Sequence, residues 1–346
     1  MPIASFVDYL PVMDEFIAHW SDTDAELVLP ENNTATELSD FTGLRGTLDD
    51  IKAQLQVRLN DLENARIALD QLRLTAGDHI ANFNRRLRAD FPNNQLFNRL
   101  PPVPNRTAGR DAFVTALDDV LDLWSRVNAQ PASPLFTPPL LLLGNLTRAQ
   151  LVTLRTSIDA AFTTRGNLER TLSETRINRN RSQDRARELM RLYRLRIEGL
   201  YAPDSTTVLT LPRLTPLPGH TPQPVILSGN YDLTDARAEL TWTASSDADL
   251  ATYELRSTPG PEYSAEDETT LATLPPGGPL AYQTSTGLAT PGSAVTYKLY
   301  VRLTTGNEAG SAPLTITRPL YPPSKRPVQP ALVKSAPPQP PTVPRR

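Results

Sequence analysis

An apolar residue recurs at every seventh position over a long stretch in the first half of the chain. The repeat consists of Leu48, Leu55, Leu62, Leu69, Ala76 and Phe83, with a second apolar row three or four residues further on. Such a repeat is typical of a long helix that packs against another helix along its length. We therefore expect a helix over residues 36–91, with Gly43 and Gly46 as breaks in its first turns and Thr47 as a candidate N-cap.

A second long helix is predicted over residues 148–200. It opens on a complete capping box of Thr147 and Gln150, beside a hydrophobic staple of Leu146 and Leu151. Shorter helices are expected near the N-terminus and over 108–128, and the leucine run 140–143 is expected to enter a local core. Each long apolar stripe must be buried, either by a partner helix within the chain or by the same stripe of another subunit. The sequence leaves both arrangements open.

The apolar period changes from near 3.6 to 2 after a proline-rich segment. Alternation over 238–242 and 297–303 marks strands with one buried face. Short segments separated by Gly, Pro, Asn and Asp suit seven strands between 222 and 317. We therefore predict an α plus all-β multidomain chain. Its parts are an elongated, coiled-coil-like antiparallel helical hairpin or bundle (1–200), a proline-rich linker (201–221), a seven-stranded β-sandwich (222–317) and a basic, proline-rich extended tail (318–346).

Several motifs of the β segment occur in the order found in bacterial fibronectin type III domains. They are Leu240-Thr-Trp242, the acidic turn before Tyr253, Gly287-Leu288, Tyr297-Lys-Leu-Tyr-Val301 and Gly306-Asn-Glu-Ala-Gly-Ser311. On these motifs, residues 222–317 resemble that family. The resemblance implies a sandwich that binds or spaces rather than one that catalyses, and it names no ligand.

No motif indicates an enzyme, a metal or a cofactor. The chain contains no cysteine, and its three histidines, His19, His79 and His220, do not have the spacing of metal ligands. Asp247 and Asp249 could ligate calcium, but an Asp-x-Asp turn without further oxygen donors more often caps its own backbone. We therefore expect a protein that is not an enzyme and that needs no metal or cofactor.

Export and membrane signals are not evident in the sequence. The N-terminal residues lack a basic region followed by an apolar one, and no run of about 18 apolar residues occurs. We expect no signal peptide and no membrane span, and a location in the cytoplasm or in a particle assembled there.

Positive charge gathers on the second long helix. Residues 165–196 carry ten arginines and four acids. The candidate partner-binding residues are Arg176, Arg179, Arg181, Arg185 and Arg187. We expect them to bind an acidic protein surface. Nucleic acid is the alternative partner, and it fits less well because the chain as a whole is acidic. The run from Glu262 to Glu268 has the opposite sign, and is either a solvated loop or a contact for a basic partner.

The tail is the second basic segment. Residues 318–346 hold six cations, ten prolines and no acid, which predicts an extended, partly polyproline-II segment. Lys325, Arg326, Lys334, Arg345 and Arg346 are its candidate partner-binding residues. Its PxxP spacings also fit the peptides that dock in aromatic grooves.

These features favour a non-enzymatic structural or assembly protein that contacts protein partners or itself. In this hypothesis the helical body is a spacer, the sandwich makes protein contacts and the tail is a tether. One alternative is a surface adhesion or carbohydrate-associated module. Another is a nucleic-acid-binding accessory protein that uses the arginine-rich helix.

Overall fold

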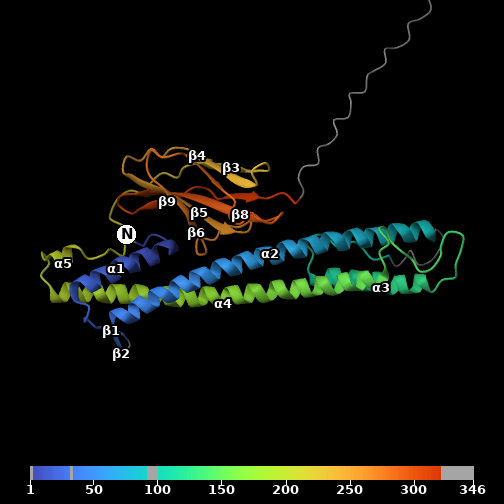
Figure 1. The fold of residues 1–346 in the computed structure, drawn as a ribbon, viewed down its shortest axis with the longest axis horizontal. Helices are drawn as coiled ribbons and strands as arrows, with labels where there is room; N and C mark the ends of the chain where they lie inside the picture. Colours follow the sequence, from blue (N-terminus) through green and yellow to red (C-terminus); the bar gives the residue numbers. More distant parts are fainter. Residues whose placement is uncertain (1–2, 32–33, 92–99, 321–346) are drawn as a thin grey trace, which may run out of the picture.

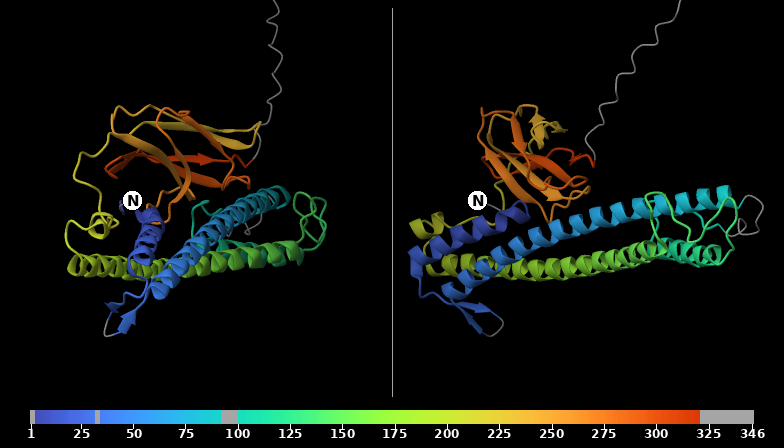
Figure 2. Two further views of the ribbon diagram at one scale, coloured as in Figure 1. Left: turned by 60° about the vertical axis from the view of Figure 1, so that its left-hand side comes forward. Right: turned by 45° about the vertical axis from the view of Figure 1, so that its right-hand side comes forward.

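The computed structural model describes residues 3–31, 34–91 and 100–320. Two parts lie side by side in it (Figure 1): a long helical hairpin, and a β unit formed by residues 222–320. The β unit lies along one flank of the hairpin, and the hairpin continues beyond it at the end that carries α3 (Figure 2).

The hairpin consists of α2 (Leu38–Asp90) and α4 (Arg148–Leu200), 53 residues each. At 1.5 Å per residue each helix is about 80 Å long. The two helices run antiparallel and pack along most of their length, so the apolar stripes are buried within one chain. This resolves the choice between pairing within the chain and pairing between subunits for these two helices.

The structure confirms the predicted capping box of α4 but not the predicted breaks in the first turns of α2. The capping box of Thr147 and Gln150 is present at the start of α4, where the Gln150 N–H donates to the Thr147 hydroxyl at 3.3 Å. Helix α2 begins close to the expected residue 36, but the expected breaks at Gly43 and Gly46 and the Thr47 N-cap are wrong. Glu37 caps that helix in a box with Asp40, and the helix continues unbroken through Gly43 and Gly46, so Thr47 lies in its interior. Nothing crowds either glycine, and the helix simply passes through them.

Shorter elements complete a core at each end of the hairpin. At one end, η1 (Phe6–Asp8) leads into α1 (Tyr9–Asp24), which is followed by the β1 (Leu29–Glu31) and β2 (Thr34–Thr36) hairpin. There Trp20 stacks on Tyr193 with ring centroids 4.9 Å apart. At the other end, α3 (Arg110–Asn128) packs Trp124 against Phe83. The leucine run lies beside α3: its first and third residues, 140 and 142, are buried in this core, whereas the second and fourth are exposed.

The β unit contains two packed sheets. One has the order β3 (Leu227–Asp232), β4 (Arg237–Trp242), β7 (Ala281–Thr284); the other has the order β10 (Leu314–Thr317), β8 (Ala294–Leu303), β5 (Leu250–Pro259), β6 (Thr269–Leu274). An additional short strand, β9 (Glu308–Gly310), also pairs with β8. The β unit therefore contains eight strands in its described residues, one more than predicted, because the short strand β9 precedes β10 on the same edge of β8.

The proline-rich segment between the two parts contacts both of them. It contains one short helix, α5 (Thr206–Leu209). His19 Nε2 donates to the carbonyl of Thr207 at 3.0 Å, and Leu211 is buried in the core near α1. Further on, the Leu217 N–H donates to Thr305 O at 3.0 Å. In the described ranges, no helix combines the length and the apolar character that a membrane crossing requires.

A charged contact between the helical hairpin and the β unit

The face of the β unit that meets the hairpin carries charged side chains. Strand alternation explains this: Leu255 of β5 and Val301 of β8 point into the β core, whereas Glu254, Arg256 and Arg302 point out of it. An outward sheet face is ordinarily hydrated, but these side chains are buried here, and Asp8 of η1 lies against them. We call Glu254, Arg256, Tyr300 and Arg302, with Glu268 and Glu308, the docking face.

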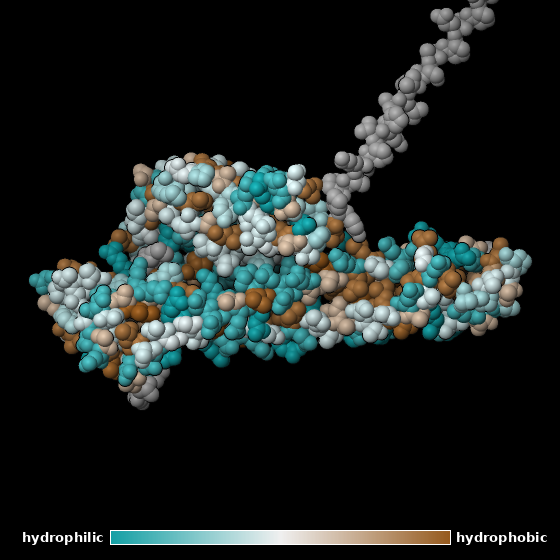
Figure 3. Space-filling model, in the orientation of Figure 1, coloured by the Kyte–Doolittle hydropathy of each residue, from teal (hydrophilic) through white to brown (hydrophobic). Residues whose placement is uncertain are grey.

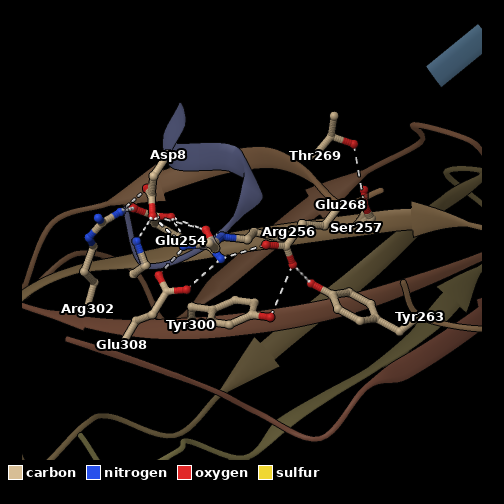
Figure 4. Close-up of polar contacts among 12 residues, drawn as sticks. Asp8, Glu254, Arg256, Ser257, Tyr263, Glu268, Thr269, Tyr300, Arg302 and Glu308 are labelled. Atoms are coloured by element: carbon tan, nitrogen blue, oxygen red, sulfur yellow. Dashed lines mark hydrogen bonds and ion pairs between the residues drawn. The ribbon is translucent and has the colours of Figure 1, made fainter. Parts of the chain in front are cut away.

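Arg256 is the centre of the docking face (Figure 4). Its guanidinium is fully buried and lies 2.6 Å from Glu254, 2.8 Å from Glu268 and 2.6 Å from Glu308. It also stacks over the ring of Tyr300, whose centroid is 4.0 Å away. Burial lowers the pKa of Arg256, but the hydrogen bonds and charges of the three carboxylates outweigh burial and raise it. Arg256 is therefore a permanent cation held by acids on three sides.

Arg302 connects this cluster to the N-terminal segment of the chain. Its Nη1 lies 3.0 Å from Glu254 and 2.8 Å from Asp8, the last residue of η1. The Asp8 side chain is 1% exposed and also accepts hydrogen bonds from the N–H groups of Ala4 and Ser5. The N-terminal turn is thus fixed between the β unit and the start of α1.

Helix α4 supplies the second charged contact. Arg179 donates to Asp267 Oδ1 at 2.9 Å and to Glu266 Oε2 at 2.9 Å, and Arg176 pairs with the same Asp267. These carboxylates belong to the acidic run 262–268. That run therefore faces a basic partner, and in this structure the partner is a helix of the same chain.

Helix α2 completes the contact with two hydrogen bonds, one accepted by a carboxylate and one between uncharged side chains. Glu63, which pairs with Arg66 at 2.7 Å, accepts from the Ala294 N–H at 3.1 Å. The Thr269 hydroxyl donates to Gln56 at 3.1 Å. Residues 56 and 63 are seven apart, so both lie on one face of α2, and that face makes these two hydrogen bonds.

The remaining predicted site residues lie elsewhere. Arg185 pairs with Glu31 at 2.7 Å, and this hydrogen bond lowers the pKa of the Glu31 carboxyl more than burial raises it. Arg181 and Arg187 are exposed on α4. Lys325, Arg326, Lys334, Arg345 and Arg346 lie outside the described residues. Of the ten predicted positions, the structure thus brings Arg176 and Arg179 together at one acidic segment.

Sequence reasoning did not identify the docking face itself. Arg256 and Arg302 are single charges on predicted strands, and an outward-facing charge normally indicates a solvent-exposed position. A signal was present in the alternation, because 254, 256 and 302 repeat a charge on one side of two strands that pair. Metal-ligating side chains gather at a separate place, around His220, which is described below.

Comparisons with known proteins do not assign the chain to a family. No family model matches it, and no curated protein matches it. Among solved structures, an Fn3-like protein from Clostridium thermocellum is 22% identical over 29% of this chain and 96% of that chain, with a TM-score of 0.23. The fibronectin type-III domain of human fibronectin type III domain containing protein 3 is 17% identical over 32% of this chain and 97% of that chain, with a TM-score of 0.22. The pectate lyase PelI from Erwinia chrysanthemi is 14% identical over 27% of this chain and 28% of the lyase, with a TM-score of 0.23. The chain thus spans little more than a quarter of the lyase. TM-scores this low do not support an inference about fold or function from these structures. The description of a helical hairpin with a two-sheet β unit rests on the structure itself.

Proposed function

We propose that this chain is a non-enzymatic structural protein that assembles with copies of itself or with protein partners. The β unit serves as a fibronectin type III-like contact module, which its ordered motifs and two-sheet architecture support. The basic segment 318–346 serves as a tether. The hairpin is a frame rather than a simple spacer, because the β unit lies beside it instead of following it in line.

The observation that carries this proposal is the half of the hairpin that the described residues of the β unit leave uncovered. Beyond the β unit, the end that carries α3 projects freely, and Figure 3 shows hydrophobic residues on its surface. In the connection from α3 to α4, Leu135 is 62% exposed and Leu143 is 82% exposed. Large apolar side chains gathered at one end of a molecule often mark a protein contact.

The arginine-rich helix gives less support to nucleic-acid binding. Arg176, Arg179 and Arg185 each pair with a carboxylate of the same chain. A phosphate would have to displace those carboxylates, so the charge available to it is smaller than the sequence suggests.

Sedimentation velocity over a wide range of protein concentrations tests the proposal, together with dihydrazide crosslinking of acidic side chains. We expect concentration-dependent association and crosslinks between copies. The double variant Leu135→Ser and Leu143→Ser should weaken association, whereas Val57→Ser, at a position that is 59% exposed on α2, should leave it unchanged. A protein that stays monomeric at every concentration, without crosslinks between copies, would contradict self-assembly.

A further inference from the structure

Three metal-ligating side chains converge at the start of the β unit. His220 Nε2 lies 3.2 Å from Asp247 Oδ1 and 3.6 Å from Asp249 Oδ1. One ligand atom from each of the three residues lies within 4.8 Å of the other two. His220 comes from the proline-rich segment and the two aspartates come from the turn before β5, so the fold brings together residues that are far apart in the sequence.

We propose that His220, Asp247 and Asp249 form a binding site for a divalent transition-metal ion of the Zn²⁺ class. Two ligand atoms about 2.1 Å from one tetrahedral ion lie about 3.4 Å from each other. The two distances from His220 fall on either side of that value. Small rotations of the His220 and Asp249 side chains would bring all three atoms onto one ion, and water would fill the remaining position.

The protein holds the Asp247 carboxylate in the orientation that such a site needs. Its Oδ2 accepts from the Gln223 N–H at 3.1 Å and from the Ser245 hydroxyl at 3.1 Å, whereas Oδ1 is the atom that faces His220. The Asp247 side chain is only 10% exposed. Hydrogen bonds of this kind to a ligating carboxylate are typical of the surroundings of metal ligands.

The backbone beside His220 is also held in place. Asn307 Nδ2 donates to Leu217 O at 3.1 Å, and Gly219 lies against Asn307 and Thr305 so closely that a Cβ there would approach the Asn307 amide to 3.2 Å. An ion on His220, Asp247 and Asp249 would therefore join two segments that already lie together. Its effect would be to fix the proline-rich segment to the β unit.

The donor set selects the class of metal. An imidazole nitrogen with two carboxylate oxygens suits Zn²⁺ and its neighbours, whereas Ca²⁺ and Mg²⁺ prefer oxygen ligands alone. The alternative is that the histidine only hydrogen-bonds to the aspartates, and that arrangement predicts no stoichiometric metal binding.

Calorimetric titration of the metal-free full chain with Zn²⁺ tests the proposal. We expect one equivalent of Zn²⁺ to bind. His220→Gln or Asp249→Asn should weaken binding by about tenfold or more, since mutating a residue that only hydrogen-bonds to a metal-coordinating side chain already causes a loss of this size. His79→Gln, on α2, is the matched control and should bind as the unmodified chain does. Ca²⁺ should not compete.

A second measurement reports the structural effect. Trypsin cleavage after the exposed Arg213 should slow when Zn²⁺ is present, and His220→Gln should abolish that protection. Absence of stoichiometric binding would overturn the proposal, and so would equal binding by the unmodified chain and by His220→Gln.

Discussion

Arg179 Nη1 lies 2.9 Å from Oδ1 of Asp267, and the two side chains are 6% and 0% exposed. This pair joins α4 to the β unit where water has little access. Removing Asp267 leaves the buried Arg179 guanidinium with the exposed Glu266 carboxylate as its remaining paired acid and takes the same carboxylate from Arg176, so the loss exceeds what an exposed pair contributes.

Asp267→Ala should therefore lower the free energy of unfolding by about 3–5 kcal/mol. Urea denaturation followed by circular dichroism measures this, and the hairpin and the β unit should then unfold in separate transitions. Glu188→Gln is the control, since it breaks an Arg–Glu pair on the same helix whose members are 55% and 51% exposed. That change should cost little, because water already screens both members of the pair. Equal losses in the two variants would show that the Asp267 pair does not hold the parts together.

Arg256→Lys should destabilise the β unit although it keeps the positive charge. Lysine cannot make the two parallel hydrogen bonds that Arg256 makes to Glu308, at 3.0 and 2.6 Å, while also reaching Glu254 and Glu268. We expect a loss of about 2–3 kcal/mol, the order of one hydrogen bond between charged groups. Calorimetric melting provides the measurement. Arg237→Lys, on β4 and 35% exposed, should change the melting temperature little, and a similar small change in Arg256→Lys would argue against the prediction.

Buried tyrosines predict a loss of stability at alkaline pH. Burial raises the pKa of Tyr193 and of Tyr300 to about 12, and also raises that of Tyr297. In the unfolded chain a tyrosine ionises near pH ~10. The free energy of unfolding is therefore unaffected by the ionisation of these tyrosines below about pH 10. It falls as the pH rises toward the pKa values of the folded state, by about 1.4 kcal/mol per pH unit for each tyrosine.

Tyr297→Phe separates this effect from hydrogen bonding. The Tyr297 hydroxyl is buried and has no hydrogen-bond partner among the described residues, so its removal should not destabilise the protein at neutral pH. Above pH ~10 the variant should lose stability less steeply than the unmodified chain. Denaturation in urea at several pH values gives both slopes, and identical slopes would refute the assignment.

Thr147→Ala should lower the stability of the hairpin by about 1 kcal/mol, because it removes the cap that accepts the Gln150 N–H. Thr153→Ala, one turn and a half later on the exposed side of α4, should be neutral or slightly stabilising, since alanine favours the helix. Thermal melting compares the two. A cost at Thr153 equal to that at Thr147 would mean that the cap is not responsible.

Local sequence patterns were sufficient to predict the separate helices. The heptad row from Leu48 to Phe83 and the capping box at Thr147 depend on residues within a few turns, and both long helices could be predicted from them. The breaks expected at Gly43 and Gly46 do not occur because glycine weakens a helix without having to end it. The strand β9 was not predicted because its three residues are too few to display an alternating pattern.

The docking of the two parts could not be predicted in the same way. Arg179 and Asp267 are 88 positions apart. The arginine-rich helix and the acidic run were each visible, but charge alone does not say whether two such segments meet each other, water or another molecule. The same holds for His220 and Asp247, because only the folded path of the proline-rich segment brings them together.

The two arginines of α4 also determine where along the hairpin the β unit can lie. A long helix presents a similar surface at every turn, about 5.4 Å apart, so a contact made of interchangeable apolar side chains could slide by one turn at small cost. Arg176 and Arg179 both pair with Asp267, and a displaced β unit would leave that carboxylate buried without a cation. The charges thus act against axial slippage and give the molecule a single longitudinal position for its β unit.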